Sequence, residues 1–145
     1  MDISNRKAHF EFSIIQKYTA GIVLTGTEIK SVRLGKASFN DSYCLFFKGE
    51  LLLRNLHIAE YGFGGVYNHE PTRERKLLLR KAELRKLESK IKEKGYTIVP
   101  LKLFLTEKGL AKVEIGLGKG KKTFDKRETI KSRESEREIR RRFGV

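Results

Sequence analysis

Two segments in the first half of the chain carry residue types that favour β-strands. Residues 9–24, HFEFSIIQKYTAGIVL, are rich in β-branched and aromatic side chains and are broken at Gly21, which predicts two strands. Residues 42–58, SYCLFFKGELLLRNLHI, predict a hairpin that turns at Lys48-Gly49. Residues 1–8 are polar, and we expect them to form a short arm.

Between and after these segments, the apolar residues recur with the period of a helix. In TGTEIKSVRLG, Thr25 and Glu28 have capping-box spacing, and Gly35 is placed to end the helix. A longer amphipathic helix is predicted from Pro71, which suits a first helical turn, to Gly95, with a break or bend near Arg80. Its apolar positions are Leu77, Leu84, Leu87 and Ile91.

A second hairpin is predicted in YTIVPLKLFLTEKGLAKVEIGLG, residues 96–118, whose last strand alternates apolar and polar residues. The sequence thus predicts about six antiparallel strands with two or three helices between them. This pattern is typical of an α+β protein that is mainly β, with an OB-type β-barrel and flanking helices. The open face of such barrels commonly binds RNA or single strands. We expect this barrel domain to span residues 1–118.

The charge of the chain indicates a polyanionic partner. Thirty-two Lys and Arg stand against 18 Asp and Glu, which gives a net charge of +14. Residues 119–145 contribute only +6 of this, with eleven basic and five acidic residues, so the barrel is basic as well. Nucleic acid is the favoured partner, and an anionic membrane surface is the alternative.

Other features bear on the compartment of the protein. No apolar run approaches the roughly 18 residues of a membrane span, and the first residues lack the apolar stretch of a signal peptide. The single cysteine, Cys44, lies in an apolar run and is expected to be a buried thiol. We therefore expect a cytoplasmic protein without disulfides.

Residue types used in catalysis are scattered rather than clustered. His9, His57 and His69 are far apart and show no metal-ligand spacing. GLGKGKKT resembles a phosphate-binding loop, but Lys121 stands where that motif requires glycine. We expect no enzyme activity, metal or cofactor. Two alternatives to a protein that only binds RNA stay open, namely an RNA-processing enzyme on a barrel scaffold and a structural ribosomal protein.

The C-terminal segment, residues 119–145, which we call the basic tail, allows three interpretations. It could be a solvated charge run, a helix on a membrane surface, or a segment that is disordered when free and folds against an anionic surface. We favour the third, because too few apolar residues are available for packing or membrane insertion. Lys and Arg would contact phosphates, and Phe124 could stack on a base. The large apolar residues are Phe124, Ile130, Ile139, Phe143 and Val145.

Five blocks that span nearly the whole chain resemble the SsrA-binding protein family (small protein B), in the family's order and spacing. They are NRKAHFEF, GTEIKSVRLGKASFNDSY, EPTRERKLLL, GYTIVPLKLF and GKGKKTFDKRETIKSRE. The resemblance implies a six-stranded OB-type barrel that binds the tRNA-like domain of transfer-messenger RNA, also called SsrA RNA. It also implies delivery of that RNA to stalled ribosomes, which leads to ribosome rescue and to tagging of the nascent peptide for degradation. The implied partners are this RNA, the small ribosomal subunit with its 16S ribosomal RNA, and elongation factor Tu indirectly through the charged RNA.

The resemblance also implies individual site residues. Asn5, Leu79 and Lys112 match positions that bind transfer-messenger RNA, and Thr19 stands where the family has an acidic contact residue. In the basic tail, which the resemblance places as a helix in the empty messenger channel near the decoding centre, Phe124 replaces a histidine common in relatives. That change keeps stacking but loses the hydrogen bonds of the imidazole ring. The implied tail residues are Gly120, Lys121, Lys122, Phe124, Asp125, Lys126, Arg127, Lys131 and Arg133.

Overall fold

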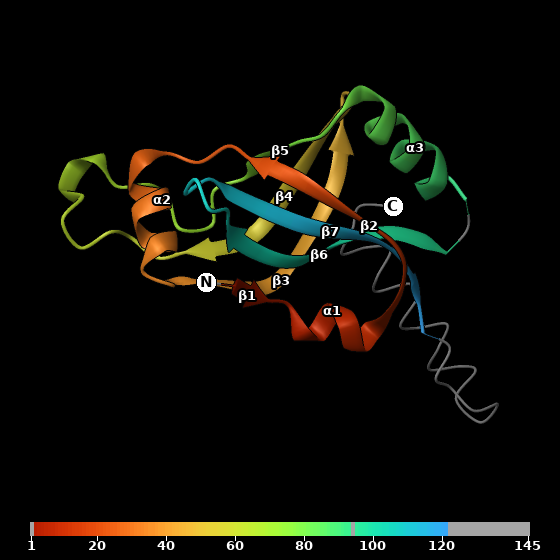
Figure 1. Ribbon diagram of the computed structural model, residues 1–145, viewed down its shortest axis with the longest axis horizontal. Helices are drawn as coiled ribbons and strands as arrows, with labels where there is room; N and C mark the ends of the chain where they lie inside the picture. The colour runs from red at the N-terminus through yellow and green to blue at the C-terminus, as the bar shows by residue number, and fades with distance from the viewer. Residues whose placement is uncertain (1, 94, 122–145) are drawn as a thin grey trace.

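One antiparallel sheet organises the computed structural model, which describes residues 2–93 and 95–121 (Figure 1). Seven strands lie in the order β1-β6-β7-β2-β5-β4-β3. Strand β3 at one edge also contacts β6 and β1 at the other, so the sheet curls into a nearly closed barrel. The predicted mainly β, α+β barrel is confirmed, with seven strands rather than six.

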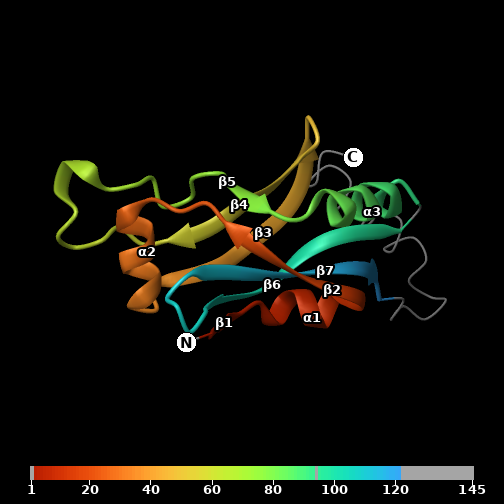
Figure 2. The same cartoon turned by 45° about the horizontal axis from the view of Figure 1, so that its top comes forward.

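The elements follow one another along the chain with short connections. They are β1 (Asp2–Ser4), α1 (Arg6–Glu11), β2 (Phe12–Ile22), α2 (Gly26–Arg33), β3 (Ala37–Phe47), β4 (Glu50–Ile58), the 3-10 helix η1 (Gly65–Tyr67), β5 (Arg75–Leu78), α3 (Lys81–Ile91), β6 (Tyr96–Leu105) and β7 (Ala111–Gly120). In Figures 1 and 2, α2 lies at one end of the barrel and α3 at the other, and the loop that contains η1 projects beyond α2.

The N-terminal prediction was wrong in two respects. Within residues 9–24 there is one strand, Phe12–Ile22, rather than two, because Gly21 is paired on both sides inside β2, and residues 9–11 belong to the helix α1. The predicted polar arm, residues 1–8, contains β1 and the first half of α1. Sequence periodicity missed β1 because it has only three residues and depends on its pairing with β6.

The predicted helix from Pro71 to Gly95 is the second correction. Residues 75–78 form β5, which pairs with β2 and β4, and the helix α3 begins only after Arg80. The position of the predicted break was therefore right, but the segment before it is a strand. Both Arg75 and Leu77 point into the barrel with none or almost none of their surface exposed, which is the two-residue period of a strand.

The remaining element predictions are confirmed. The β3–β4 hairpin turns at Lys48 and Gly49, with φ of 51° and 79°, the left-handed pair that a type I′ turn requires. Thr25 and Glu28 form the capping box of α2, and Gly35 follows the helix with φ of 74°. The second hairpin joins β6 to β7, and the apolar residues Val113, Ile115 and Leu117 of β7 are buried. Cys44 is also buried, and burial raises the pKa of its thiol.

Two apolar clusters stabilise the fold. The larger one fills the barrel, and the smaller one lies outside it, where Ala8 of α1 packs against Phe12 and Leu101. The side chains beside this smaller cluster require glycine in β7, because a Cβ atom at Gly116 would lie 2.9 Å from side-chain atoms of both Ile14 in β2 and Leu101 in β6. The helix α1 thus covers one part of the outside of the sheet.

Strand β7 ends beyond the predicted domain boundary at residue 118. It continues to Gly120, and the N–H of Lys121 donates to the carbonyl oxygen of Glu11 at 3.0 Å. The rest of the basic tail, from Lys122 onward, lies outside the described residues.

Candidate nucleic-acid interface

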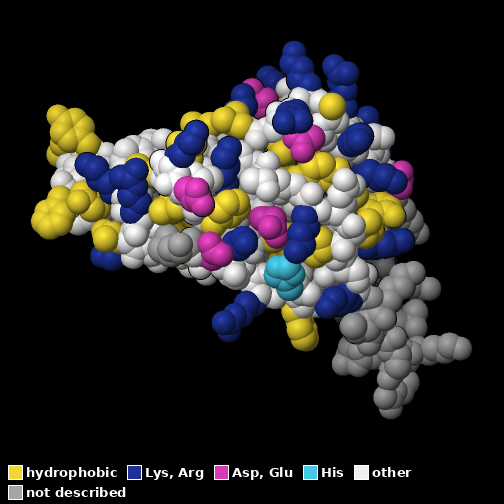
Figure 3. Space-filling view, in the orientation of Figure 1, with side chains coloured by type: hydrophobic (Ala, Val, Ile, Leu, Met, Phe, Trp, Pro, Cys, Tyr) yellow, Lys and Arg dark blue, Asp and Glu magenta, His cyan; other side chains and the backbone are white. Residues whose placement is uncertain are grey.

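The outward side chains of β6, β7, β2 and β5 form one continuous surface, which we call the outer face. Alternate residues of these strands are buried in the barrel, so the residues between them point outward. Lys and Arg outnumber Asp and Glu on this side of the protein (Figure 3). The outer face consists of Lys17 and Thr19 of β2, Lys76 and Leu78 of β5, Lys102 and Phe104 of β6, and Lys112 and Glu114 of β7.

Strand register aligns part of the outer face in a row centred on Lys112. Lys112 is paired with Phe104 on one side and with Gly21 on the other, and Gly21 is paired with Leu78. A Cβ atom at Gly21 would lie 3.7 Å from Nζ of Lys112 and 3.3 Å from Cβ of Leu78. Because Gly21 has no side chain, the Lys112 ammonium group can lie over the backbone of β2, beside an exposed leucine.

The lysines of the outer face differ in their ion pairs. Three of them have a carboxylate nearby: Lys17–Glu114 at 3.6 Å, Lys76–Glu50 at 3.1 Å and Lys102–Asp2 at 3.7 Å. Exposed pairs of this kind contribute only about 0–1 kcal/mol, so a phosphate group can replace the carboxylate at little cost. Lys112 makes no ion pair with any described residue, and it can therefore bind phosphate without losing one.

An aromatic ring adds a second kind of contact to the outer face. The ammonium group of Lys102 lies 5.2 Å from the ring centroid of Phe104, and the ring is only partly buried. A ring among lysines can stack on a base while the lysines contact phosphates. Sequence analysis missed Lys17, Lys102 and Phe104, although their alternation with buried strand residues was the signal that could have identified them.

The structure places three of the four barrel residues implied by the resemblance on or beside the outer face. Thr19 is exposed and paired with Glu114, next to the row that contains Lys112. Leu79 directly follows β5 and packs partly against the barrel core, so its neighbour Leu78 is the leucine that faces outward.

Asn5 lies at the border of this surface, where α1 covers the continuation of the same side of the sheet. Its side chain is largely occupied by the protein itself. Nδ2 donates to the carbonyl oxygen of Pro100 at 2.8 Å, and Oδ1 accepts from the N–H of Ala8 at 3.4 Å. Only 9% of the surface of Asn5 is exposed. Its backbone N–H also donates to the carbonyl oxygen of Leu101, so Asn5 attaches the start of α1 to β6.

A second basic cluster lies where the basic tail leaves the barrel. The ammonium groups of Lys90 and Lys119 lie 5.7 and 5.3 Å from the ring centroid of Tyr96. Of the predicted tail residues, Gly120 and Lys121 are near this cluster in the chain, while Lys122, Phe124, Asp125, Lys126, Arg127, Lys131 and Arg133 lie outside the described residues.

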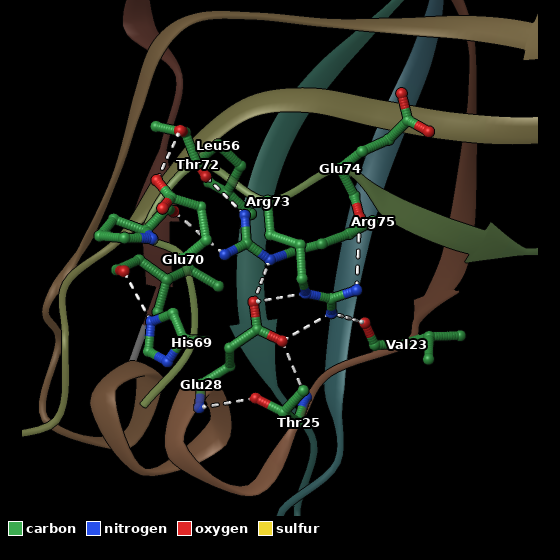
Figure 4. A network of polar contacts seen from close by, with 12 residues as sticks. Val23, Thr25, Glu28, Leu56, His69, Glu70, Thr72, Arg73, Glu74 and Arg75 are labelled. Atoms are coloured by element: carbon green, nitrogen blue, oxygen red, sulfur yellow. Dashed lines mark hydrogen bonds and ion pairs between the residues drawn. The ribbon is translucent and has the colours of Figure 1, made fainter. Parts of the chain in front are cut away.

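A buried polar network holds α2 against the segment that leads into β5 (Figure 4). Oε2 of Glu28 accepts from Nε of Arg75 at 2.5 Å, and Oε1 accepts from Nη2 of Arg73 at 2.6 Å. Arg75 also donates to the carbonyl oxygens of Leu56 at 2.6 Å and Pro71 at 3.1 Å. Neither Glu28 nor Arg75 has any exposed surface, so this network determines where β5 begins and, with it, the position of Leu78 on the outer face.

The pKa values in this network reflect a balance between burial and pairing. Burial by itself would raise the pKa of Glu28, but hydrogen bonds from Arg73 and the Thr25 backbone, together with the charge of Arg75, hold the pKa below its ordinary value. Burial lowers the pKa of Arg75, although the Glu28 carboxylate acts in the opposite direction. Both groups are therefore charged and mutually compensated in the core, which is a structural arrangement rather than a reactive one.

The charged and aromatic groups of the outer face are suited to binding a polyanion. No group of three or more His, Cys, Asp or Glu residues in residues 2–93 and 95–121 is arranged to hold a metal ion. None of the helices in the same part of the chain is long and apolar enough to span a membrane. Lysine ammonium groups and partly exposed rings on a curved sheet suit a phosphate backbone with accessible bases.

Comparisons with known proteins agree with the sequence blocks described above. The family model described as SmpB protein matches residues 2–144. The SsrA-binding protein of Phocaeicola vulgatus is 58% identical over 143 residues, which cover 99% of this chain and 95% of the relative. The SsrA-binding protein of Flavobacterium psychrophilum is 58% identical over 141 residues, covering 97% and 94%.

A solved structure described as "tmRNA-SmpB: a journey to the center of the bacterial ribosome" has the same fold as this chain. The TM-score is 0.72 and the sequence identity 48%, and the match covers 94% of this chain and 95% of the solved one.

Proposed function

The chain belongs to the SmpB family of SsrA-binding proteins, and we propose that its outer face is the surface that binds the tRNA-like domain of transfer-messenger RNA. The observation that supports this proposal best is the row centred on Lys112, whose ammonium group makes no ion pair with any described residue and lies over Gly21 beside exposed Leu78. That row presents a cation for a phosphate group together with apolar surface for a sugar or base. The protein acts as an RNA-binding adaptor of trans-translation on the ribosome, in the cytoplasm, and has no catalytic role.

Within the outer face, the residues take different roles. Lys112 contacts phosphate, and Thr19 contacts the RNA through its hydroxyl group on the neighbouring strand. Asn5 and Leu79 are positioning residues, because Asn5 attaches α1 to β6 and Leu79 packs against the core directly after β5.

The basic tail serves a separate contact, with the small ribosomal subunit. Its surplus of Lys and Arg suits 16S ribosomal RNA in the empty messenger channel. At about 1.5 Å per residue, a helix over residues 125–143 would extend roughly 28 Å along such a channel. Elongation factor Tu takes part indirectly, by binding the charged RNA that this protein carries.

The test of the barrel proposal is a charge reversal on the outer face. Lys112→Glu should weaken binding of transfer-messenger RNA roughly tenfold or more and lower the slope of log K against log salt by about one or more. The matched control is Lys86→Glu on the exposed side of α3, which makes the same charge change away from the outer face. Equal losses in the two variants, with unchanged circular dichroism, would show that net charge rather than this surface determines binding.

The tail proposal has its own test. Replacing both Asp125 and Arg127 by alanine should abolish peptide tagging on stalled ribosomes and leave the affinity for free transfer-messenger RNA intact. A parallel loss of free-RNA affinity would mean that the tail belongs to the same RNA site as the barrel. Sequencing the RNA that co-purifies with the protein, and measuring its stoichiometry with ribosomes, separates an adaptor from a structural ribosomal component.

A further inference from the structure

The loop between β4 and β5 exposes an unusual amount of apolar surface at its tip. Phe63 is 91% exposed, Val66 92% and Tyr67 86%, and no other exposed large apolar side chain among the described residues exceeds 81%. Figures 1 and 2 show this loop projecting beyond α2, at the end of the barrel opposite α3. Exposed aromatic residues gathered at one point of a surface indicate a binding site.

The tip is held in a defined conformation. The side chain of Asn68 bridges the loop, accepting from the N–H of Tyr61 and donating to its carbonyl oxygen, each at 2.8 Å. The loop also packs against this amide, because a Cβ atom at Gly64 would lie only 2.7 Å from Nδ2 of Asn68. The two rings on one side of the tip, Tyr61 and Phe63, meet edge to face at 5.6 Å between centroids.

The base of the loop is anchored by His69. Its Nε2 donates to the carbonyl oxygen of Ile58 at 2.8 Å, and Nδ1 lies 2.9 Å from the hydroxyl oxygen of Thr27 in α2. This side chain is buried. The exposed rings therefore project from a scaffold that is attached to both β4 and α2, and little ordering is needed before they bind a partner.

The charges beside the tip are positive. The ammonium group of Lys30 in α2 lies 5.4 Å from the ring centroid of Tyr61, and both Arg33 at the end of this helix and Lys36 just beyond it are exposed. Lys and Arg side chains gather over α2 next to the hydrophobic side chains of the tip (Figure 3). The acidic residues of the loop, Glu60, Glu70 and Glu74, all lie toward its two ends in the sequence, outside residues 61–69.

We propose that the tip of this loop is a stacking site for unpaired RNA bases, with Phe63 and Tyr67 as the platform. The basic side chains of α2 neutralise the adjacent phosphates. Flat rings beside Lys and Arg are the combination that binds single-stranded nucleic acid, because every base has a face that can stack. The site extends the RNA contact of the outer face toward the α2 end of the barrel, and it rests on the proposed RNA-binding function.

A tryptophan reporter tests the stacking directly. The chain contains no tryptophan, so Phe63→Trp and Tyr67→Trp each introduce a single indole at the tip. In the full-length protein, saturating transfer-messenger RNA should quench the fluorescence of this indole. A fully paired RNA duplex of equal charge should leave the fluorescence unchanged. Indole fluorescence that is the same in the free protein and in the saturated complex would overturn the proposal.

Alanine variants measure what the rings contribute. Phe63→Ala and Tyr67→Ala each remove a ring on which a base stacks. Each should therefore weaken binding of transfer-messenger RNA by roughly 5- to 150-fold. Val66→Ala is the matched control, because its side chain is equally exposed but has no ring, and it should leave affinity unchanged. An equal loss for Val66→Ala, or an indole that responds to ribosomal proteins but not to RNA, would mean that a protein docks on the tip.

The outcomes distinguish the two proposals. If the wild-type protein does not bind the RNA, the proposed function fails. If it binds, and Lys112→Glu weakens binding while the ring variants do not, only the stacking site fails. The tip side chains make few contacts with the fold, so unchanged circular dichroism in all variants is the expected control result.

Discussion

The carboxylate of Glu28 and the guanidinium group of Arg75 lie 2.5 Å apart, and neither side chain has any exposed surface. The two residues come from α2 and β5 and are 47 positions apart in the sequence. A buried ion pair of this kind seldom makes a fold more stable than apolar residues would, but removing one partner leaves the other charge uncompensated. The pair therefore determines how these two segments are placed relative to each other.

Glu28→Gln should destabilise the protein by about 3–5 kcal/mol, because it leaves Arg75 buried without a countercharge. Urea unfolding followed by circular dichroism gives this free energy. The control is Arg54→Met, which breaks the exposed pair with Glu74 and should cost about 1 kcal/mol or less. Similar losses in both variants would show that water reaches the Glu28 network.

Acid should weaken the fold through the same carboxylate. Because the pKa of Glu28 in the folded state lies below its ordinary value of 4.5, the unfolded state binds a proton more readily. The stabilisation is complete above the unfolded pKa and is lost as the pH falls through the lower folded pKa. Urea unfolding from about pH 7 to pH 3 should show a steeper decline for the wild type than for Glu28→Gln. If the free energy of unfolding falls equally steeply with pH in the wild type and in Glu28→Gln, then Glu28 is not the source of the acid sensitivity.

Adding a methyl group at Gly116 should overpack the outside of the sheet beside Ile14 and Leu101. The new Cβ atom would meet the side chains of Ile14 and Leu101 at 2.9 Å, so Gly116→Ala should cost about 1–3 kcal/mol. Gly120→Ala, in the same strand but with nothing within 4 Å of the added atom, is the control. If Gly116→Ala unfolds at the same urea concentration as the control, then the side chains of Ile14 and Leu101 can shift away from the added methyl group without cost.

Removing the negative charge from the outer face should strengthen RNA binding. Glu114→Gln releases Lys17 from its ion pair and removes a carboxylate that repels phosphate, so affinity for transfer-messenger RNA should rise several-fold at low salt. Filter binding or fluorescence anisotropy at two salt concentrations measures this. Glu107→Gln in the exposed β6–β7 turn is the charge-matched control. A gain of the same size in Glu107→Gln would indicate a general effect of net charge.

Local chemistry explains which parts of the fold could be predicted from the sequence. The turn at Lys48-Gly49, the capping box of Thr25 and Glu28, and the alternation along β7 are each set by neighbouring residues, and all three are present. Strand β5 could not be recognised in this way. Its four residues lie in a run whose apolar spacing predicts a helix. The buried partners of Arg75 come from segments that are distant in the sequence, so no local pattern indicates that this residue is buried.

The outer face was only partly predictable for the same reason. Lys112 and Thr19 were identified through a family resemblance, but their proximity depends on the register of β2 against β7. The space over Gly21 that accommodates Lys112 appears only when three strands are side by side. Asn5 was assigned to RNA binding by the same resemblance, and its two hydrogen bonds within the protein became apparent only in three dimensions.

The end of β7 has a mechanical consequence. On one side this strand pairs with β2 as far as Gly120. On the other side it pairs with β6 as far as Lys119. A force that pulls the chain beyond Lys121 along the strand axis acts on both rows of hydrogen bonds in shear, so many bonds must break together rather than one after another. The barrel can therefore bear tension applied through its C-terminal segment without unravelling from that end.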